Sequence, residues 1–109
     1  MTYCTIISTA SSPDEADKLA AILLENKAAA CVQMLPISSA YRWKGKIERS
    51  AEILMLIKTT DASYPRVQEL IKAHHSYEVP EIIKLQIIDG LPEYLDWIIS
   101  GTVGDGVAG

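Results

Sequence analysis

Two adjacent histidines, His74 and His75, are the side chains of this sequence best suited to bind a metal ion. Imidazole nitrogens are good ligands for copper, zinc and nickel. Adjacent positions on a helix diverge by about 100°, whereas histidine pairs that chelate one zinc ion stand four residues apart. Two ligands also leave a site incomplete, so symmetry in an oligomer would have to supply the others. The spacing alone favours the structural alternative, in which His74 is a hydrogen-bonded core residue and His75 is solvated.

Two carboxylates follow the histidines, one on each side of a proline. Glu78 and Glu81 flank Val79 and Pro80, and a proline restricts the residue before it to extended geometry. A stiff turn is therefore expected. One carboxylate could orient a histidine ring, either in the outer shell of a metal site or as part of a general base. The plainer interpretation is a pair of surface carboxylates where a strand begins.

The sequence contains no motif for an activated nucleophile or for binding a phosphate. Ser8, Ser12 and Cys31 lie in no nucleophile elbow, and no glycine-rich phosphate loop occurs. We therefore predict a protein that is not an enzyme.

Aromatic and cationic side chains gather on two of the expected strands. Tyr41 and Trp43 share one strand face, and Lys58 ends the next strand. These residues could line a small-molecule cleft or fill a subunit interface. For an oligomeric protein the interface is the stronger interpretation.

The elements that must position these side chains follow from hydrophobic periodicity and turn signals. Ser12, Pro13 and Glu15 have the spacing of a capped helix start, and Gly45 fits a hairpin turn. Pro36 predicts an interruption of the second strand, with either an edge position or a bulge there. In order, we expect a strand at 3–9, a helix at 13–26, a strand at 28–35 that resumes at 39–44, a strand at 47–60, a helix at 65–74, a strand at 81–88 and a short helix at 93–100.

This order, β-α-β-β-α-β, predicts an α+β fold: a ferredoxin-like sandwich with a short C-terminal helix. Its antiparallel sheet carries both main helices on one face. The segment 53–57, Ile-Leu-Met-Leu-Ile, is apolar on both faces, as in a central strand that is covered twice. Because a large exposed apolar face marks an association surface, we predict a homo-oligomer.

Length and composition indicate one globular domain at 1–100 and a flexible tail at 101–109. Of the 109 residues, 49% are hydrophobic and 22% are charged, and the net charge is −4. That charge argues against nucleic acid as a partner and against docking on an anionic membrane. Two cysteines without ligand spacing, together with no signal peptide and no membrane span, indicate a reducing compartment, the cytoplasm.

Several motifs together resemble the CutA divalent-cation tolerance family, and they occur in its order and spacing from about residue 3 to residue 100. They are Ala29-Ala30-Cys31, Tyr41-Arg42-Trp43-x-Gly45-Lys46, Ile57-Lys58-Thr59, His74-His75-x-Tyr77-Glu78-Val79-Pro80-Glu81 and Tyr94-Leu95-x-Trp97. The resemblance implies a ferredoxin-like protomer in a tight homotrimer, similar to the PII-type signalling trimers. It also implies a role in tolerance to copper and other divalent cations in the bacterial cytoplasm.

The copper ligands that the resemblance implies are His74, His75 and a cysteine at the end of the first strand. Ser8 occupies that position here. Loss of a soft thiolate weakens a Cu(I) site most and leaves imidazoles suited to Cu(II) or Zn(II). We therefore expect a non-enzymatic trimer of metal-ion homeostasis that binds copper or another divalent cation through the two histidines, with no organic cofactor.

The competing hypothesis is a PII-like small-molecule sensor or signalling trimer. Its ligand would sit in a cleft between subunits lined by Tyr41, Trp43, Lys58 and Glu78, and the effects of metals would be indirect.

Overall fold

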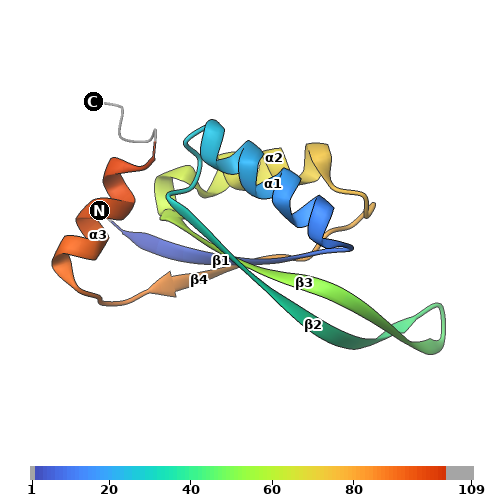
Figure 1. Ribbon diagram of the computed structural model, residues 1–109. Helices are drawn as coiled ribbons and strands as arrows, with labels where there is room; N and C mark the ends of the chain where they lie inside the picture. The colour runs from blue at the N-terminus through green and yellow to red at the C-terminus, as the bar shows by residue number, and fades with distance from the viewer. Residues whose placement is uncertain (1, 103–109) are drawn as a thin grey trace.

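Strands with alternating apolar residues pair into one antiparallel sheet, in the order β2-β3-β1-β4. Helices α1 and α2 cover one face of this sheet, and α3 lies beyond one end of it (Figure 1). The structure is a computed structural model that describes residues 2–102.

The order of elements confirms the α+β, ferredoxin-like arrangement that the sequence predicts, with its short C-terminal helix. The elements are β1 (Tyr3–Ala10), α1 (Pro13–Glu25), β2 (Cys31–Trp43), β3 (Lys46–Thr60), the 3-10 turn η1 (Asp61–Ser63), α2 (Tyr64–His74), β4 (Ile82–Ile87) and α3 (Pro92–Ser100). None of the helices between residues 2 and 102 is long and apolar enough to cross a membrane.

Helix α1 begins where its capping residues predict. The hydroxyl of Ser12 accepts a hydrogen bond from the backbone N–H of Glu15 at 3.1 Å, which satisfies one of the free donors of the first turn. Pro13 occupies the start of the helix, where its missing N–H loses no hydrogen bond. The cap therefore places the side chain of Glu15 in a defined first turn.

The second strand differs from its prediction, because it is not interrupted at Pro36. β2 runs without a break from Cys31 to Trp43, and Pro36 pairs with Ile53 of β3. Since β2 is an edge strand, half of its N–H groups face away from the sheet, and a proline is tolerated there. The β2–β3 hairpin is consequently one continuous arm, which turns at Lys44 and Gly45 with positive φ at both residues.

The core lies between the sheet and helices α1 and α2. β3 presents alternate residues to it, so that Met55 and Ile57 are fully buried, whereas Leu54 and Leu56 on the opposite face are partly buried. The helices contribute the buried side chains Ala16, Leu19, Ala20, Leu23, Val67 and Ile71. The domain is thus packed on one side of its sheet only.

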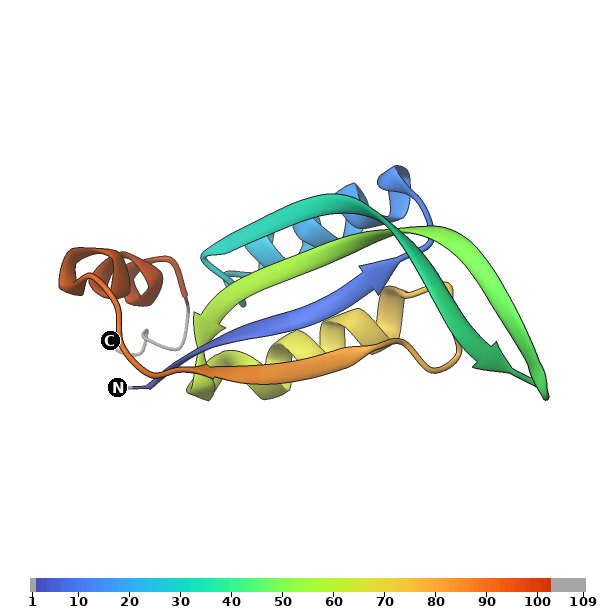
Figure 2. The same ribbon diagram turned by 90° about the horizontal axis from the view of Figure 1, so that it is seen from below.

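The other face of the sheet is open (Figure 2). Leu35, Ile83 and Leu85 lie on this face and are 57%, 47% and 49% exposed. The arm also projects past both helices, so that the molecule is 48 Å long but only 26 Å and 21 Å across. Cover of the open face by further subunits stays a prediction, because a single chain does not test it.

The chain beyond α3 begins in a packed conformation. The predicted tail starts at residue 101, yet Thr102 is 2% exposed and Gly101 lies directly against Ala30. The remainder of that tail, 103–109, lies outside the described residues.

The close approach of Gly101 to Ala30 gives a test of this packing. A methyl group at Gly101 would lie 2.9 Å from the Cβ of Ala30, so we expect Gly101→Ala to lower the free energy of unfolding by about 1–3 kcal/mol. Gly90→Ala is the control, because there the methyl group would meet only the flexible end of Leu95. Urea unfolding measures both variants, and equal effects would contradict the packing of Gly101.

Candidate functional site

A hollow of about 460 Å³ separates the start of α1 from the end of α2, and both histidines line it. Helix α2 ends at His74, and His75 is extended, with φ −83° and ψ 146°. The change of backbone direction at His75 sends the two consecutive rings to different places. The His-His pair is therefore brought to one hollow but not to one point.

The ring of His75 is buried and uses both of its nitrogens within the chain. Its side chain is 0% exposed. Nε2 lies 2.7 Å from the carbonyl oxygen of Thr9, which can only accept, so Nε2 donates. The backbone N–H of Tyr77 donates to Nδ1 at 3.0 Å, and the Tyr77 ring packs against the imidazole with centroids 4.8 Å apart. The imidazole is therefore the neutral tautomer with its proton on Nε2.

His74 is exposed and keeps one nitrogen free. Its Nδ1 donates to the carbonyl of Leu70, one turn earlier in α2, at 2.9 Å. No hydrogen bond to Nε2 is present in the part of the chain that the structure describes. The sequence predicted a buried His74 and a solvated His75 as the structural alternative, and the structure shows the reverse. The reason is that α2 ends at His74, so the extended backbone at His75 turns its ring inward.

The carboxylate that organises the site is Glu15, which the sequence alone did not place there. Its oxygens accept hydrogen bonds from the backbone N–H and the hydroxyl of Ser11, both at 2.8 Å, and from those of Ser76, at 2.6 and 3.0 Å. Oε2 also lies 3.7 Å from Nδ1 of His75. Burial opposes ionisation, but these four hydrogen bonds outweigh it and lower the pKa of Glu15 to about 2.

Glu78 and Glu81, the carboxylates that the sequence places beside the histidines, are both exposed and have no hydrogen bond among the described side chains. The one sequence feature that could have drawn attention to Glu15 instead was its place in a capping box with Ser12. Only half of that box forms, because the carboxylate turns toward Ser11 and Ser76 instead of back to the cap.

Tyr77 ties the same turn to the sheet. Its hydroxyl donates to Oε2 of Glu52, in β3, at 2.8 Å. Burial and the neighbouring Glu52 carboxylate together raise the pKa of Tyr77 to about 12, so the phenol keeps its proton and remains a donor. The turn between α2 and β4 is thus held by β1, α1 and β3 at once.

Ser8 supplies no metal ligand. It is fully buried on the helix side of β1, and its hydroxyl has no hydrogen-bond partner. Cys4, on the same face of β1, is also buried, and burial raises the pKa of its thiol to about 12, so the thiol keeps its proton in this structure. Among residues 2–102, no three His, Cys, Asp or Glu side chains form a group that could hold a metal ion.

The residues of the predicted ligand cleft do not meet within one chain. Trp43 pairs with Lys46, whereas Lys58 pairs with Cys31, so Trp43 and Lys58 lie at opposite ends of the hairpin. The ammonium of Lys58 instead lies 5.6 Å from the ring centroid of Tyr94. Tyr41 lies on the arm beside Ser50, with 3.4 Å between their hydroxyl oxygens. A cleft formed between subunits stays a prediction.

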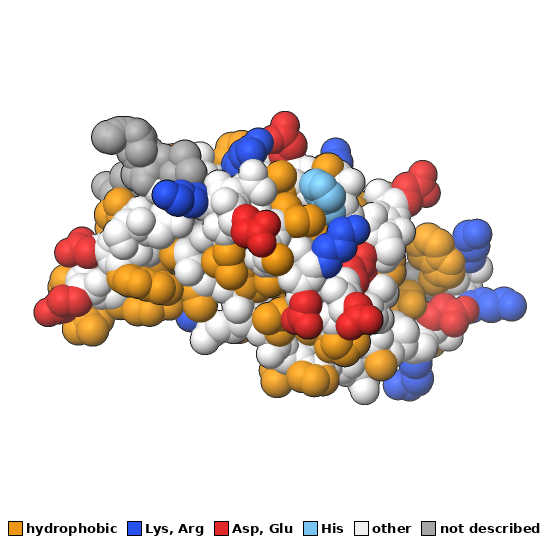
Figure 3. Space-filling view, turned by 45° about the horizontal axis from the view of Figure 1, so that its top comes forward, with side chains coloured by type: hydrophobic (Ala, Val, Ile, Leu, Met, Phe, Trp, Pro, Cys, Tyr) orange, Lys and Arg blue, Asp and Glu red, His pale blue; other side chains and the backbone are white. Residues whose placement is uncertain are grey.

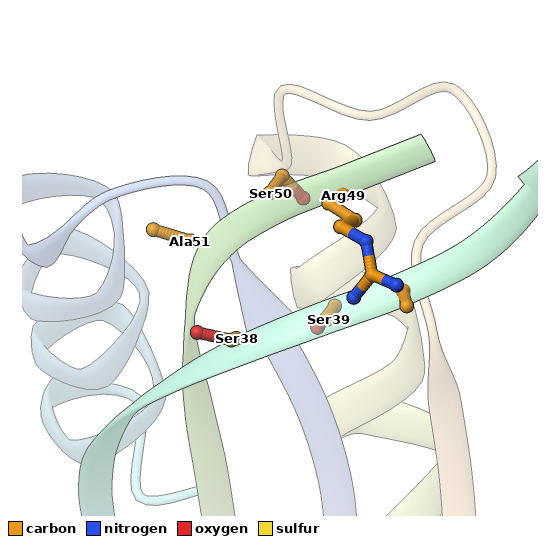
Figure 4. A pocket seen from close by; sticks show the side chains of 6 residues that line it. Ser38, Ser39, Arg49, Ser50 and Ala51 are labelled. Carbon is orange, nitrogen blue, oxygen red and sulfur yellow. The ribbon is translucent and has the colours of Figure 1, made fainter. Parts of the chain in front are cut away.

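A second hollow, of about 350 Å³, lies on the arm. Figure 4 shows Arg49 reaching from β3 toward β2, among the small side chains of Ser38, Ser39, Ser50 and Ala51. With a guanidinium and no carboxylate or imidazole in its lining, this hollow does not suit a metal cation. The hollow beside His74 is therefore the candidate cation site.

The split β-α-β-β-α-β topology with strand order β2-β3-β1-β4 defines the chain as a ferredoxin-like α+β protein. Within that class it belongs to the family of the CutA1 divalent ion tolerance protein, whose sequence profile matches residues 4–101. The family is named for tolerance to divalent ions and not for a reaction. This match confirms the resemblance to the CutA family that the sequence motifs indicated.

Individual relatives agree along almost the whole chain. It is 42% identical over 98 residues to the divalent-cation tolerance protein CutA of Thermus thermophilus, a match covering 89% of this chain and 95% of that protein. The solved CutA of Archaeoglobus fulgidus superposes with a TM-score of 0.90 at 43% identity, covering 91% of this chain and 97% of the other. CutA1 of Oryza sativa superposes with a TM-score of 0.91 at 36% identity, covering 94% of each chain.

The hydrogen bonds of Glu15 predict an acid-sensitive contribution to stability. Its pKa falls from 4.5 to about 2 on folding, so the ionised carboxylate stabilises the folded state above pH 4.5, and this contribution disappears as the pH falls toward 2. We expect Glu15→Gln to lower the free energy of unfolding by about 2–3 kcal/mol at pH 7, and by progressively less below pH 4.5. Denaturant unfolding at several pH values measures this.

Asp17→Asn is the matched control for Glu15→Gln. Asp17 is an exposed carboxylate on the same helix, without a hydrogen bond to any described residue. A pH-independent difference between wild type and Glu15→Gln, or an equal effect of the two substitutions, would show that the carboxylate does not hold the turn.

Proposed function

We propose that this protein contributes to tolerance of divalent metal ions by binding Cu(II) or Zn(II) weakly at His74. The observation that supports this is the free Nε2 of an exposed imidazole, beside a hollow that is also lined by the exposed carboxylate of Asp14. The sequence predicts both histidines as ligands, but the nitrogens of His75 are already engaged. His74 is therefore the proposed contact of the cation.

One imidazole from each chain makes a weak site, since stable sites for these ions use three or four ligands. The remaining ligands would be water or side chains of other subunits. Because Ser8 offers no thiolate, the site favours Cu(II) and Zn(II) over Cu(I). The cation is accordingly cargo that exchanges, and not a resident cofactor.

We propose a homotrimer as the working assembly, and two features of the surface support it. The open face of the sheet exposes Leu35, Ile83 and Leu85, as expected of an association surface. The two ends of the molecule also carry opposite charge (Figure 3). The tip of the arm bears Arg42, Lys44, Lys46 and Arg49 against one carboxylate, Glu48, and the α3 end bears Asp89, Glu93 and Asp96.

These two ends are complementary in apolar surface as well. Trp43 and Ile47 on the arm are 58% and 68% exposed, and Leu91 and Trp97 at the α3 end are 66% and 48% exposed. Contact between the arm of one subunit and the α3 end of the next is heterologous, and heterologous contacts form a ring when the rotation from one subunit to the next closes. Ring closure after three subunits is the geometry proposed here.

We further propose that the protein is cytoplasmic and not an enzyme. Both cysteines are free, as in a reducing compartment, and the family takes its name from tolerance. The Archaeoglobus fulgidus relative is described as periplasmic, and cell fractionation distinguishes the two compartments.

The cation proposal predicts that His74→Ala weakens Cu(II) and Zn(II) binding at least about tenfold, the loss that follows even when only an outer-shell partner of a metal site is removed. Isothermal titration measures the affinity. Lys72→Ala, on the same exposed end of α2, should bind as the wild type does. Equal affinities of wild type and His74→Ala would refute the proposed contact.

The assembly proposal predicts that charge reversal at either end disrupts the trimer. Arg42→Glu with Lys46→Glu, or Glu93→Lys with Asp96→Lys, should each reduce the molar mass toward that of a monomer, because like charges then face each other. Carrying all four substitutions in one chain should restore the trimer. Lys72→Glu is the control, and light scattering measures molar mass. A monomeric wild type would reject the trimer itself, whereas trimeric reversed variants would reject only the charged contact.

A further inference from the structure

We propose that His75 is a positioning residue: a neutral imidazole that joins the end of β1 to the turn between α2 and β4, and takes no part in cation binding. The proposal gives the two histidines different roles. It is based on the contacts of His75 and does not require that His74 bind a cation.

The first step is the bridge itself. Nε2 donates to the carbonyl of Thr9 at 2.7 Å, and Nδ1 accepts from the N–H of Tyr77 at 3.0 Å. A neutral imidazole is one of the few uncharged side-chain groups that donate at one end and accept at the other. Thr9 and Tyr77 are far apart in the sequence, and the ring of His75 bonds to the backbone of both.

The second step is the consequence of breaking the bridge. A cation at Nδ1 would displace the N–H of Tyr77, and a cation at Nε2 would displace the carbonyl of Thr9. The ring is 0% exposed, so the displaced backbone group would stay buried without a partner. Such a loss would reduce the affinity for a cation about tenfold or more relative to a free imidazole. His74, whose Nε2 is free, carries no such penalty.

The third step is what the bridge holds. The turn also receives the carboxylate of Glu15, which accepts from Ser76 at 2.6 Å, and reaches β3 through the hydroxyl of Tyr77 on Glu52 at 2.8 Å. With these contacts His75, the residue after α2, has an extended backbone, with φ −83° and ψ 146°. The end of the helix, and with it the outward direction of His74, is set by the turn that His75 anchors.

The wild-type protein provides the first test. Nitrogen-15 NMR of the histidine rings should show the proton of His75 on Nε2, and addition of Zn(II) should shift the resonances of His74 and leave those of His75 in place. A His75 ring that carries its proton on Nδ1, or whose nitrogens shift with Zn(II) as those of His74 do, would overturn the proposal. This measurement needs no substitution, so it holds even where a variant fails to fold.

Amide variants of His75 provide the second test. The side-chain oxygen of asparagine can accept a hydrogen bond where Nδ1 does, and the side-chain nitrogen of glutamine can donate one where Nε2 does. Hydrogen exchange of the Tyr77 amide should be about tenfold faster in His75→Ala and His75→Gln than in wild type, and close to wild type in His75→Asn. His74→Gln should leave that exchange unchanged. Equal exchange in His75→Ala and wild type would overturn the proposal.

Zn(II) affinity separates this inference from the proposed function. His75→Asn should bind Zn(II) within about twofold of wild type, and a loss equal to that of His74→Ala would assign His75 as a ligand after all. If the wild type binds no cation, the proposed contact at His74 fails, while the NMR and exchange measurements still decide the role of His75.

Discussion

The strands of the hairpin are much longer than the helices that cover the sheet, and the rest of the structure follows from this mismatch. The 15 residues of β3 follow a curved path of about 50 Å at ~3.3 Å per residue (Figure 2), whereas the 13 residues of α1 extend over about 20 Å. Two such helices cover one face of the sheet along part of its length. The arm is the part of the hairpin that extends past the helices, and the other face of the sheet is open because both helices lie on one side. The turn between α2 and β4, called here the histidine turn, lies where the helix layer ends.

The sequence predicted nearly all of the secondary structure, because its signals are local. Ser12 and Pro13 marked the start of α1, and the unbroken apolar run around Met55 marked a central strand. The exposure of the two histidines was not predicted, because it depends on the backbone angles of one residue, His75, after the helix ends. The role of Glu15 was missed for a related reason: its partner Ser76 comes from a distant segment, and no local pattern reports such a pairing.

The net charge is a sum over the whole chain, and here it does not reveal that positive and negative side chains gather at different ends of the molecule. The chain carries −4 overall, which argued against nucleic acid and an anionic membrane as partners. The fold nevertheless collects four of the ten cationic side chains at the tip of the arm, between Arg42 and Arg49. Since the register of β2 and β3 sets this grouping, composition alone could not show it, although the residues are close in the sequence.

The chain order of the strands also orders the events of folding. β2 and β3 are joined by a tight turn at Lys44 and Gly45, so their pairing is local and is expected early. β1 pairs with β4 from the other end of the domain, and contacts that close so long a loop form late. We therefore expect a chain still leaving the ribosome to carry a finished arm but a loose histidine turn, so that the last native contacts to form are those beside the proposed cation contact, His74.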